Sequence, residues 1–334
     1  MKIINLSDFD TSWNWLKDEF PESGPWVHFT TANSRMRRDI PLRNQIVGLA
    51  AAIPAVLSAV KADGAILVSH GPRPTFYGAT AARLFNTRVP HLACSFNFTD
   101  LPQGKNRKIM ASSYRQVRRF LTYSTVERRL YSEHFGIPLE KIDMVHWSVH
   151  PPKIDWGTEP IETGDYLCAL GSQGRDYETL FTAIEKLPYI RLVVVTNRHS
   201  IKGLKIPKNV TVHIEISRER TMNILQHSRF MVLPLRDNSV PCGHVTIVSG
   251  MFYRKAIIIT DSIGIYDYIR DGDTGLFYEA RNPADLRMKI EMLWTLPGCT
   301  LNLTENAYTF AQQHCSYVNI ASYFANFITG LAAD

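Results

Sequence analysis

Two short stretches in the second half of the chain have the residue types that bind phosphate. Gly171-Ser-Gln-Gly-Arg175 follows an apolar run and precedes a helical one, and Gly243-His-Val-Thr246 opens another helical run. Backbone N–H groups at a helix N-terminus attract anions, and an arginine can hold a diphosphate by two hydrogen bonds. These residues predict a site for a phosphorylated ligand, with Gly171, Ser172 and Arg175 on one side and His244, Val245 and Thr246 on the other.

The segment after Thr246 continues the same pattern. It contains a buried strand at 256–261, a turn at Gly264 and a polar hairpin, Asp271-Gly-Asp-Thr-Gly275. This order of loop, helix, strand, turn and hairpin is how an α/β domain presents backbone N–H groups to a phosphate. Asn197 and Ser249 complete the predicted donor-binding set.

The first half contains a histidine at the expected end of a strand. Ile66-Leu-Val-Ser-His70 is followed by Gly71-Pro-Arg-Pro74, a sharp turn. His70 is our predicted catalytic residue, either as a hydrogen-bond donor to a substrate or as a group that moves a proton. The alternative is a purely structural histidine. Arg73, with Asn97 and Thr99 in the loop 95–104, is predicted to bind an acceptor.

Apolar runs alternate with helical stretches along the whole chain, which predicts parallel sheets with helices on both faces. The predicted strands are 3–6, 26–29, 65–69, 91–94, 120–123 and 143–145, then 166–170, 192–196, 210–214, 230–233, 257–260 and 275–278. The predicted helices are 43–60, 76–84, 105–119, 125–135, 177–186, 219–226, 244–252 and 283–294. The sheet is therefore built twice, with a non-periodic linker at 150–163.

The predicted architecture is α/β, with two Rossmann-like doubly wound domains facing each other across a cleft. A length of 334 residues with 45% apolar composition is enough for two cores. Ligands of such sheets bind outside the carboxyl ends of the strands. We expect two domains, at 1–152 and 153–310, followed by a C-terminal helix at 311–334.

The motifs of the second half resemble GT-B glycosyltransferases of the family 4 (group 1) type. These usually read Glu-Gly-Phe-Gly, four residues, Glu-Ala-Met, a Pro-Val-Ile-Ala-Thr strand, Gly-Gly, and Asp-Gly-x-x-Gly. A Gly-Arg pair and a Lys-Gly pair precede their first donor-domain helix, and Arg175 falls where that lysine stands. The resemblance is strong over 165–290, weaker over 60–150 and absent over 10–60. It implies a GT-B fold with an acceptor-binding domain at 1–152, a nucleotide-sugar donor domain at 153–310 and a C-terminal helix at 311–334 that crosses back to the N-terminal domain. It also implies that His70 lies near the transferred sugar.

The resemblance implies a retaining glycosyltransferase that moves a hexosyl group from a nucleotide-diphosphate sugar to a glycan or glycolipid, in bacterial surface polysaccharide synthesis. Both glutamates of the family motif are replaced: Pro241 stands at the first position and Ser249 at the second. In the family the second commonly holds the ribose hydroxyls, and the Ser249 hydroxyl can also hydrogen-bond a ribose. The alternatives are an inactive GT-B binding subunit and a nucleotide-sugar epimerase.

No cofactor is expected besides the nucleotide sugar as co-substrate, with a UDP-sugar slightly favoured. The chain lacks the Asp-x-Asp signature of metal-dependent GT-A enzymes, so we expect no metal site. Five cysteines at no metal-like spacing are expected to be reduced packing residues.

Positive charge is concentrated in the first half. Residues 1–150 hold 19 Lys and Arg against 12 Asp and Glu, whereas residues 151–334 hold 18 against 19. The densest basic stretches are 35–43 and 105–119. They predict peripheral contact with a membrane or a lipid-linked acceptor, and nucleic acid ranks last because no recognition module accompanies them. With no apolar run of about 20 residues and no signal region, the chain is expected to be cytoplasmic, possibly at the inner face of the membrane.

Several motifs also have structural explanations. Asp176 suits a helix N-cap, and Thr246 and Ser249 could be ordinary helix residues. Ser124 with Glu127 three residues later is a capping box. Asp8, Asp10 and Ser12 either bind an acceptor or cap a helix beginning near Trp13. The aromatic residues of 304–331 are expected to pack at near-helical spacing.

Overall fold

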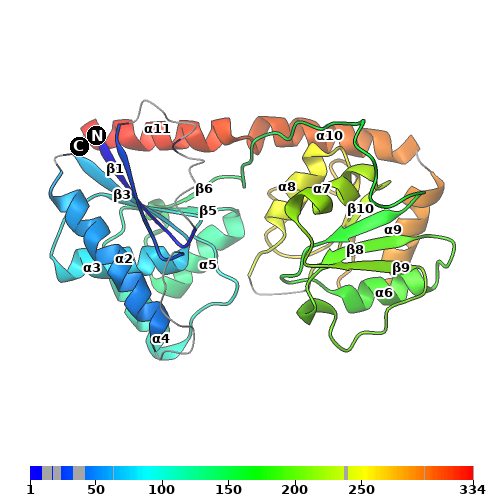
Figure 1. Ribbon diagram of the computed structural model, residues 1–334, viewed down its shortest axis with the longest axis horizontal. Helices are drawn as coiled ribbons and strands as arrows, with labels where there is room; N and C mark the ends of the chain where they lie inside the picture. The colour runs from blue at the N-terminus through cyan, green and yellow to red at the C-terminus, as the bar shows by residue number, and fades with distance from the viewer. Residues whose placement is uncertain are drawn as a thin grey trace. The chain divides into compact units, whose positions relative to one another are not determined.

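A computed structural model describes residues 1–9, 17, 24–32, 42–62, 64–236, 240–296 and 298–333, without the side chains of 299, 332 and 333. The chain forms two compact units (Figure 1). Unit 1 consists of Met1–Val145 and Tyr317–Asp334, and unit 2 consists of His146–Ser316.

Unit 1 is built on a six-stranded parallel sheet with the order β2-β1-β3-β4-β5-β6. Its strands are β1 (Lys2–Ser7), β2 (Trp26–Thr30), β3 (Ala65–His70), β4 (His91–Cys94), β5 (Arg119–Thr122) and β6 (Ile142–Met144). Its helices include α2 (Arg43–Val60), α3 (Pro72–Leu84), α4 (Gly104–Tyr114), α5 (Thr125–Phe135), the 3₁₀ turn η1 (Leu139–Lys141) and α11 (Tyr317–Ala333).

Unit 2 repeats this design with the strand order β12-β11-β10-β7-β8-β9, again all parallel. Its strands are β7 (Leu167–Leu170), β8 (Leu192–Thr196), β9 (Val210–Ile214), β10 (Met231–Leu233), β11 (Ile257–Thr260) and β12 (Leu276–Tyr278). The helices are α6 (Tyr177–Glu185), η2 (His199–Ile201), α7 (Arg218–His227), α8 (His244–Phe252), α9 (Pro283–Thr295) and α10 (Gly298–His314).

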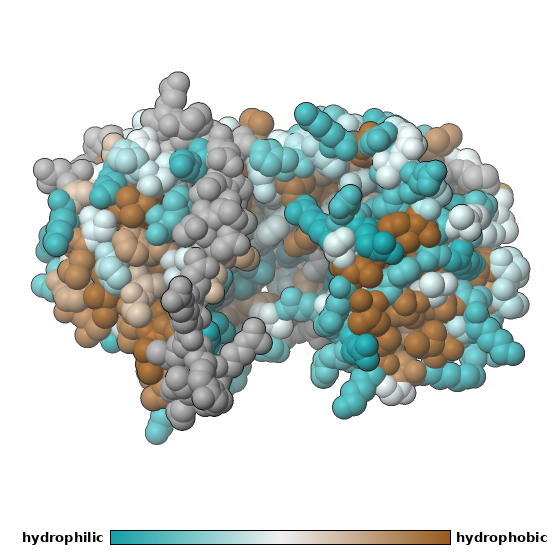
Figure 2. Space-filling view, viewed as in Figure 1, coloured by the Kyte–Doolittle hydropathy of each residue, from teal (hydrophilic) through white to brown (hydrophobic). Residues whose placement is uncertain are grey.

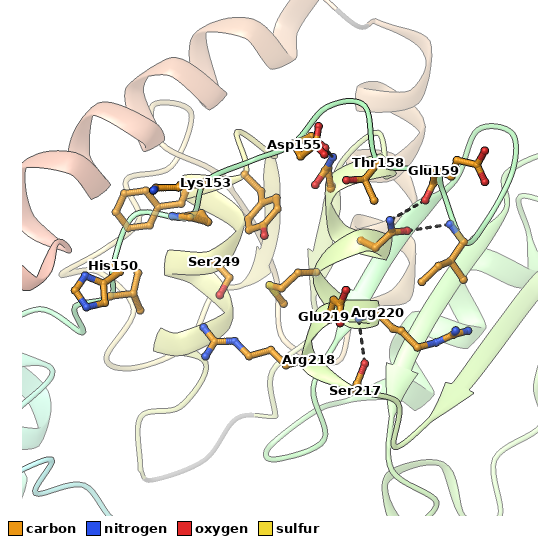
Figure 3. A pocket seen from close by; sticks show the side chains of 18 residues that line it. His150, Lys153, Asp155, Thr158, Glu159, Ser217, Arg218, Glu219, Arg220 and Ser249 are labelled. Carbon is orange, nitrogen blue, oxygen red and sulfur yellow. Dashed lines mark hydrogen bonds between the residues drawn. The ribbon is translucent and has the colours of Figure 1, made fainter. Parts of the chain in front are cut away.

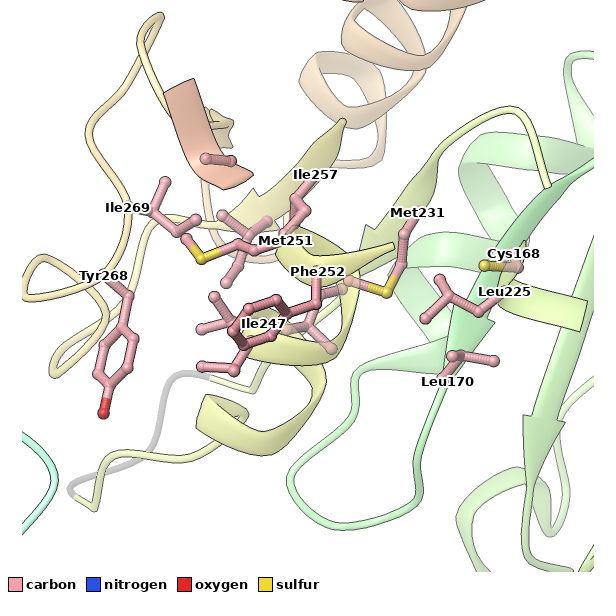
Figure 4. Close-up of a cluster of buried hydrophobic side chains, with 14 of the residues drawn as sticks. Cys168, Leu170, Leu225, Met231, Ile247, Met251, Phe252, Ile257, Tyr268 and Ile269 are labelled. Atoms are coloured by element: carbon pink, nitrogen blue, oxygen red, sulfur yellow. The ribbon is translucent and has the colours of Figure 1, made fainter. Parts of the chain in front are cut away.

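The strands of unit 2 are apolar on both faces because helices cover both. The residues of β8 and β11, Leu-Val-Val-Val-Thr and Ile-Ile-Ile-Thr, are all buried. One core cluster joins β7, β10 and β11 to α8, with Met251 and Phe252 at its centre (Figure 4). A second cluster covers the opposite face, beneath α6 and α9. Together they fix the strand ends that carry the site.

The C-terminal helix α11 belongs to unit 1, as the fold class predicts (Figure 1). Ile320 and Phe324 are 4% and 1% exposed and pack with Ile3, Leu92 and other strand residues. The Tyr323 hydroxyl donates a hydrogen bond of 2.6 Å to Asp143. The aromatic residues of 304–331 thus serve packing, as expected. They lie in two helices and not one, because α10 ends at His314 and Ser316 forms an isolated β-bridge with Val149 before α11 begins.

Most predicted elements are present, and the errors are at their ends. Helix α3 begins at Pro72, four residues before the predicted start, because proline is favoured in a first helical turn. Helix α4 ends at Tyr114 and not at Arg119, because Arg119 is already the first residue of β5. Cys94, Cys168, Cys242 and Cys315 are free thiols, as expected.

Helix α2 is long and apolar enough to cross a membrane by length and composition. Its residues Ala52, Ala55 and Val56 are at most 1% exposed and pack against β1 and β3. A core helix passes the same test, so the feature is weak evidence for a membrane span.

Ser124 and Glu127 form the predicted capping box at the start of α5. The Glu127 N–H donates to Ser124 Oγ at 3.1 Å, and Glu127 Oε2 accepts the Tyr123 N–H at 3.0 Å. Glu127 is 1% exposed, and burial raises its pKa to about 7. Its other oxygen accepts the Tyr131 hydroxyl, which itself accepts the Phe98 N–H. The carboxyl group thereby ties α5 to the loop after β4.

The raised pKa of Glu127 predicts a pH-dependent stability. The folded state binds the proton more tightly, so this contribution is complete below the ordinary pKa of 4.5 and is lost as pH rises through about 7. Glu127→Gln should therefore reduce the fall in unfolding free energy between pH 5 and pH 8, measured by urea denaturation. The control is Glu133→Gln, an exposed change on the same helix. An equal fall in wild type and Glu127→Gln would contradict the prediction.

Candidate functional site

Each sheet has a switch point where the direction of strand succession reverses, and such points form ligand crevices in doubly wound folds. In unit 2 it lies between β7 and β10, and in unit 1 between β1 and β3. The predicted residues Gly171–Arg175 follow β7, and His70 ends β3. Both predicted sites therefore lie at switch points.

Arg175 is buried at the unit 2 switch point. Its Nε donates to the Leu170 carbonyl at 3.0 Å, and Nη1 donates to the Gln173 carbonyl at 2.7 Å. The third contact is with Thr246, whose Oγ1 accepts from Nη2 at 2.9 Å. Two residues 71 positions apart, both predicted to bind the donor, are thus in direct contact. Burial lowers the pKa of Arg175, but an arginine keeps its charge.

Gly171 is required for this arrangement. It has φ of 100°, and a Cβ at this position would lie 2.6 Å from Arg175 Nη2. Asp176 is the N-cap of α6 and accepts the Thr179 N–H at 3.1 Å, so the structural explanation of Asp176 is confirmed. The loop is also joined to the end of β10, since the Arg236 N–H donates to the Gly174 carbonyl.

Helix α8 begins beside Arg175. Its N-cap is Gly243, with φ of 97°, and His244, Val245 and Thr246 form the first turn. The N–H groups of a first turn lack intrahelical acceptors and carry the positive end of the helix dipole. The charge of Arg175 and the start of α8 therefore combine at one end of the sheet, which suits an anion.

Ser172 and Asn197 are joined by Ser200, at the ends of β7 and β8. The Ser200 hydroxyl lies 2.8 Å from the Ser172 carbonyl and 2.9 Å from Asn197 Oδ1. Asn197 Oδ1 also accepts the Ser200 N–H at 2.9 Å, within the 3₁₀ turn η2. Both residues, which were predicted to bind the nucleotide sugar, lie near the Arg175 loop. The amide oxygen of Asn197 is already bonded to Ser200.

His244 is 6% exposed and stacks on Tyr268, with ring centroids 4.8 Å apart. Its Nε2 lies 3.1 Å from the Gly264 carbonyl, and burial lowers its pKa to about 4. It is therefore neutral at pH 7. Gly264 has φ of 82°, and a Cβ there would lie 2.3 Å from Pro241 Cβ. Pro241 thus packs closely against the turn that sequence analysis singled out.

Ser249 lines a cavity of 830 Å³ within unit 2 (Figure 3). Its hydroxyl donates to the Val245 carbonyl at 2.8 Å, which leaves the oxygen able to accept. Arg218 and Ser217 at the start of α7 line the same cavity, as do residues of the linker such as Lys153 and Asp155. The linker is tied to α7, because Gln226 donates to the Asp155 carbonyl.

The linker and the start of α7 were missed as lining residues. The linker has no apolar periodicity from which its position in the fold could be predicted. In the sequence Ser217 suggests only the N-cap of a helix, and it is indeed the N-cap of α7. The predicted phosphate-facing hairpin has its groups paired internally: the Gly272 N–H donates to the Gly275 carbonyl, and Asp271 accepts the Phe277 N–H.

In unit 1, His70 is 2% exposed and its Nε2 lies 2.7 Å from Asn5 Oδ1. An amide oxygen only accepts, so His70 carries its proton on Nε2. The amide nitrogen of Asn5 then donates to His28 Nδ1 at 3.0 Å. Asn5 and His28 are direct partners in the register of β1 and β2. One asparagine therefore sets the tautomers of two histidines.

Burial and the neighbouring His28 lower the pKa of His70 to about 3. A ring that is neutral at pH 7 has a single N–H, and in His70 this N–H is bonded to Asn5. The donor and proton-transfer roles of His70 stay predictions.

His91 lies behind His70 in a second buried chain. His91 Nε2 lies 2.8 Å from Ser69 Oγ, which lies 2.8 Å from Thr75 Oγ1, and Thr75 donates to the Gly71 carbonyl at 2.7 Å. Because Thr75 uses its hydroxyl proton on the Gly71 carbonyl, it accepts from the Ser69 hydroxyl, and Ser69 in turn accepts the N–H of His91. This chain holds the turn after β3, where Gly71 caps α3 with φ of 92°.

The predicted acceptor residues Arg73, Asn97 and Thr99 are exposed at the same end of the unit 1 sheet as His70. Asp8, at the end of β1, accepts the Thr31 hydroxyl at 2.6 Å. Asp10, Ser12 and Trp13 lie outside the described residues, as do Arg35, Arg37 and Arg38. The acceptor assignments stay predictions.

Residues 175–310 match the family model described as "Glycosyl transferases group 1". A curated relative from Campylobacter jejuni, N,N'-diacetylbacillosaminyl-diphospho-undecaprenol alpha-1,3-N-acetylgalactosaminyltransferase, is 26% identical over 138 residues. That match covers 41% of this chain and 36% of the relative, so it spans about a third of the relative's length.

Solved structures are similar over nearly the whole chain. Sucrose-phosphate synthase from Thermosynechococcus elongatus has a TM-score of 0.75 at 14% identity, with 100% of both chains covered. Anabaena HepE in complex with UDP-glucose has a TM-score of 0.74 at 15% identity, with 99% of this chain and 100% of that chain covered. A glycosyltransferase from Rickettsia africae has a TM-score of 0.72 at 15% identity, with 99% of this chain and 98% of that chain covered. The comparisons confirm the predicted fold and the resemblance found in the motifs.

The buried contacts of Arg175 predict that it is needed for stability as well as for any ligand. Arg175→Ala leaves two carbonyls and a hydroxyl without their donor and should lower the unfolding free energy by about 2–3 kcal/mol. Denaturant titration measures this, with the exposed Arg198→Ala as the control. If Arg175→Ala unfolds like wild type, the arginine is not a structural tie.

The Asn5 bridge predicts a specific protonation state for His70. Ring-nitrogen NMR spectra of ¹⁵N-histidine-labelled protein should show a neutral ring with its proton on Nε2 throughout pH 5–8. In Asn5→Asp a carboxylate stabilises the imidazolium, so the pKa of His70 should rise. Asn106→Asp, an exposed change on α4, is the control. An Nδ1-protonated ring in the wild type would refute the bridge.

Proposed function

We propose that this chain, a GT-B protein with a glycosyl transferases group 1 domain over residues 175–310, transfers a sugar from a nucleotide-diphosphate sugar. The observation that carries the proposal is the contact between Arg175 and Thr246 beside the start of α8. A fixed cation, a hydroxyl and a helix N-terminus meet there at the switch point of unit 2. This combination suits a diphosphate leaving group, whose charge grows as the glycosidic bond breaks.

The reaction proposed is a transfer with retention of the anomeric configuration. Such a transfer depends mainly on a polarised diphosphate and an acceptor hydroxyl held on the same face of the sugar, which is positioning and electrostatics. It requires no carboxylate at position 241, where Pro241 packs against Gly264. We propose that the reaction is metal-independent and that the transferred group is a hexosyl unit.

The donor is proposed to be a UDP-sugar. The similar Anabaena structures contain UDP and UDP-glucose. In this chain the Thr246 hydroxyl, which accepts from Arg175, can donate its own proton to a phosphate oxygen. Ser249, with a free acceptor position toward the 830 Å³ cavity, is proposed to bind the ribose.

His70 is proposed to hydrogen-bond the transferred sugar as a neutral imidazole. Its Nε2 proton is used by Asn5, so its Nδ1 lone pair is the group for a sugar hydroxyl. Arg73, Asn97 and Thr99 are proposed to bind the acceptor.

The acceptor is proposed to be a glycan or a lipid-linked glycan of the bacterial surface. The Campylobacter relative is named for an undecaprenol-diphosphate-linked acceptor. Together with the basic first half of the chain, this supports a cytoplasmic protein in peripheral contact with the inner face of the membrane.

A catalytically inactive binding subunit is the second candidate. It is favoured by one observation: Pro241 and Ser249 replace the two glutamates of the family motif, and Pro241 is buried in tight contact with Gly264. Such a subunit would retain nucleotide binding without transfer.

Calorimetric titration with UDP, GDP, ADP and CMP tests the donor site, and UDP should bind best. Thr246→Val keeps the side-chain shape and should weaken UDP binding roughly tenfold, because a bond to a charged phosphate is lost. Uridine binding should not change, and Thr182→Val on the exposed face of α6 is the control.

Failure of every nucleotide to bind would overturn the donor assignment. Release of UDP from a UDP-sugar with an acceptor, with the product anomer identified by NMR, separates the transferase from the binding subunit. Nucleotide binding without turnover of any common UDP-sugar would favour the subunit.

A further inference from the structure

We infer that the amino-terminal edge of the unit 1 sheet binds the phosphate headgroup of an anionic lipid. This edge is where β3, β4, β5 and β6 begin, and it is opposite to the end that carries His70. The inference rests on the proposed membrane contact and names the surface that makes it.

Five of the eleven residues that line a cavity of 480 Å³ at this edge are basic. They come from the turn before β4, the turn after α4 and the residues around η1: Arg88, Arg115, Arg118, Arg119 and Lys141. Glu140 is the carboxylate among the lining residues. Guanidinium groups match phosphate oxygens with pairs of hydrogen bonds, so an anionic phosphate fits this lining.

Part of this charge has no protein counter-charge. Arg119 is engaged, because it donates to the Glu140 carbonyl and lies 4.0 Å from the Asp143 carboxylate. Within the described part of the chain, no ion pair forms at Arg88, Arg115 or Lys141. Arg88 and Arg115 are exposed. Like charges gathered without partners repel, and a bound anion would offset that repulsion.

A second cavity of 480 Å³, with mostly apolar side chains among its lining residues, adjoins the basic one and shares Thr87–Pro90 with it. It is lined by Val60, Phe85 and Leu331, among others. Val60 and Phe85 are 49% and 45% exposed, and the nearby Leu84 is 65% exposed. Figure 2 shows hydrophobic residues on the visible face of unit 1 over α2 and α3. A soluble phosphate would leave this apolar half unused, whereas a lipid has a hydrocarbon chain beside its phosphate.

The position of the edge also restricts the acceptor. Strand β3 has six residues from Ala65 at this edge to His70 at the other. At about 3.3 Å for each of the five steps between these residues, the two ends are about 17 Å apart. A unit docked by this edge would hold His70 away from the lipid headgroups, which suits an acceptor glycan that already extends from its lipid.

Vesicle co-sedimentation with the full chain tests the inference. Vesicles of equal parts phosphatidylglycerol and phosphatidylcholine should bind the wild type, and pure phosphatidylcholine should not. The variant Arg88→Gln, Arg115→Gln, Lys141→Gln should bind roughly tenfold more weakly, since each basic residue near an anionic surface contributes. The matched control is Lys186→Gln, Lys208→Gln, Arg287→Gln, which removes the same charge from exposed positions on unit 2 and should bind like wild type.

Phe85→Ser tests the apolar half and should also weaken binding. Melting curves of each variant establish that it is folded. The inference is overturned if the edge variant binds like wild type, if the control variant loses binding instead, or if phosphatidylcholine alone binds equally. It is also overturned if glycerol 3-phosphate binds as tightly as the vesicles, because the ligand would then be a soluble phosphate.

UDP affinity, measured in parallel, separates this inference from the proposed function. A chain that binds vesicles without UDP would refute the donor site alone, and one that binds UDP without vesicles would refute the lipid site alone.

Discussion

The burial of one guanidinium group organises the candidate site of unit 2. A buried cation is stable only when its N–H groups have acceptors, and Arg175 has the carbonyls of Leu170 and Gln173 and the hydroxyl of Thr246. These contacts require Gly171 to lack a side chain, fix the loop after β7 and place it against the start of α8. The same side chain thus shapes the site and supplies its positive charge, so loss of activity in an Arg175 variant would not by itself identify a phosphate ligand.

At the switch point of unit 1 the buried polar side chains are uncharged. His70 and His91 are buried in neutral form, because burial lowers the pKa of each to about 3. Asn5 and Ser69 then fix which ring nitrogen of each carries the proton. The switch point of unit 1 therefore holds a neutral, oriented imidazole, whereas that of unit 2 holds a cationic loop.

The two ends of the unit 1 sheet differ in chemistry. The carboxyl end holds the oriented histidine and the exposed polar residues of the loop after β4, whereas the amino end holds a group of basic residues beside a cavity lined mostly by apolar side chains. Because parallel strands share one direction, all the loops after the strands lie at one end and all the loops before them at the other. In unit 1 this direction puts the proposed sugar site and the proposed lipid site at opposite ends of one sheet.

The sequence by itself determined the two-sheet α/β organisation and the bounds of elements such as His91–Cys94 and Ile257–Thr260, because apolar periodicity and capping signals are local. It also indicated His70, Arg175 and Thr246 as polar residues at strand or helix ends. Only the tertiary structure decided that Arg175 contacts Thr246, that Asn5 lies between His28 and His70, and that residues before β4 and after α4 form one basic cavity. These contacts join residues far apart in the chain, and they depend on strand order and register, which are set by the packing of the whole sheet and leave no local pattern to read.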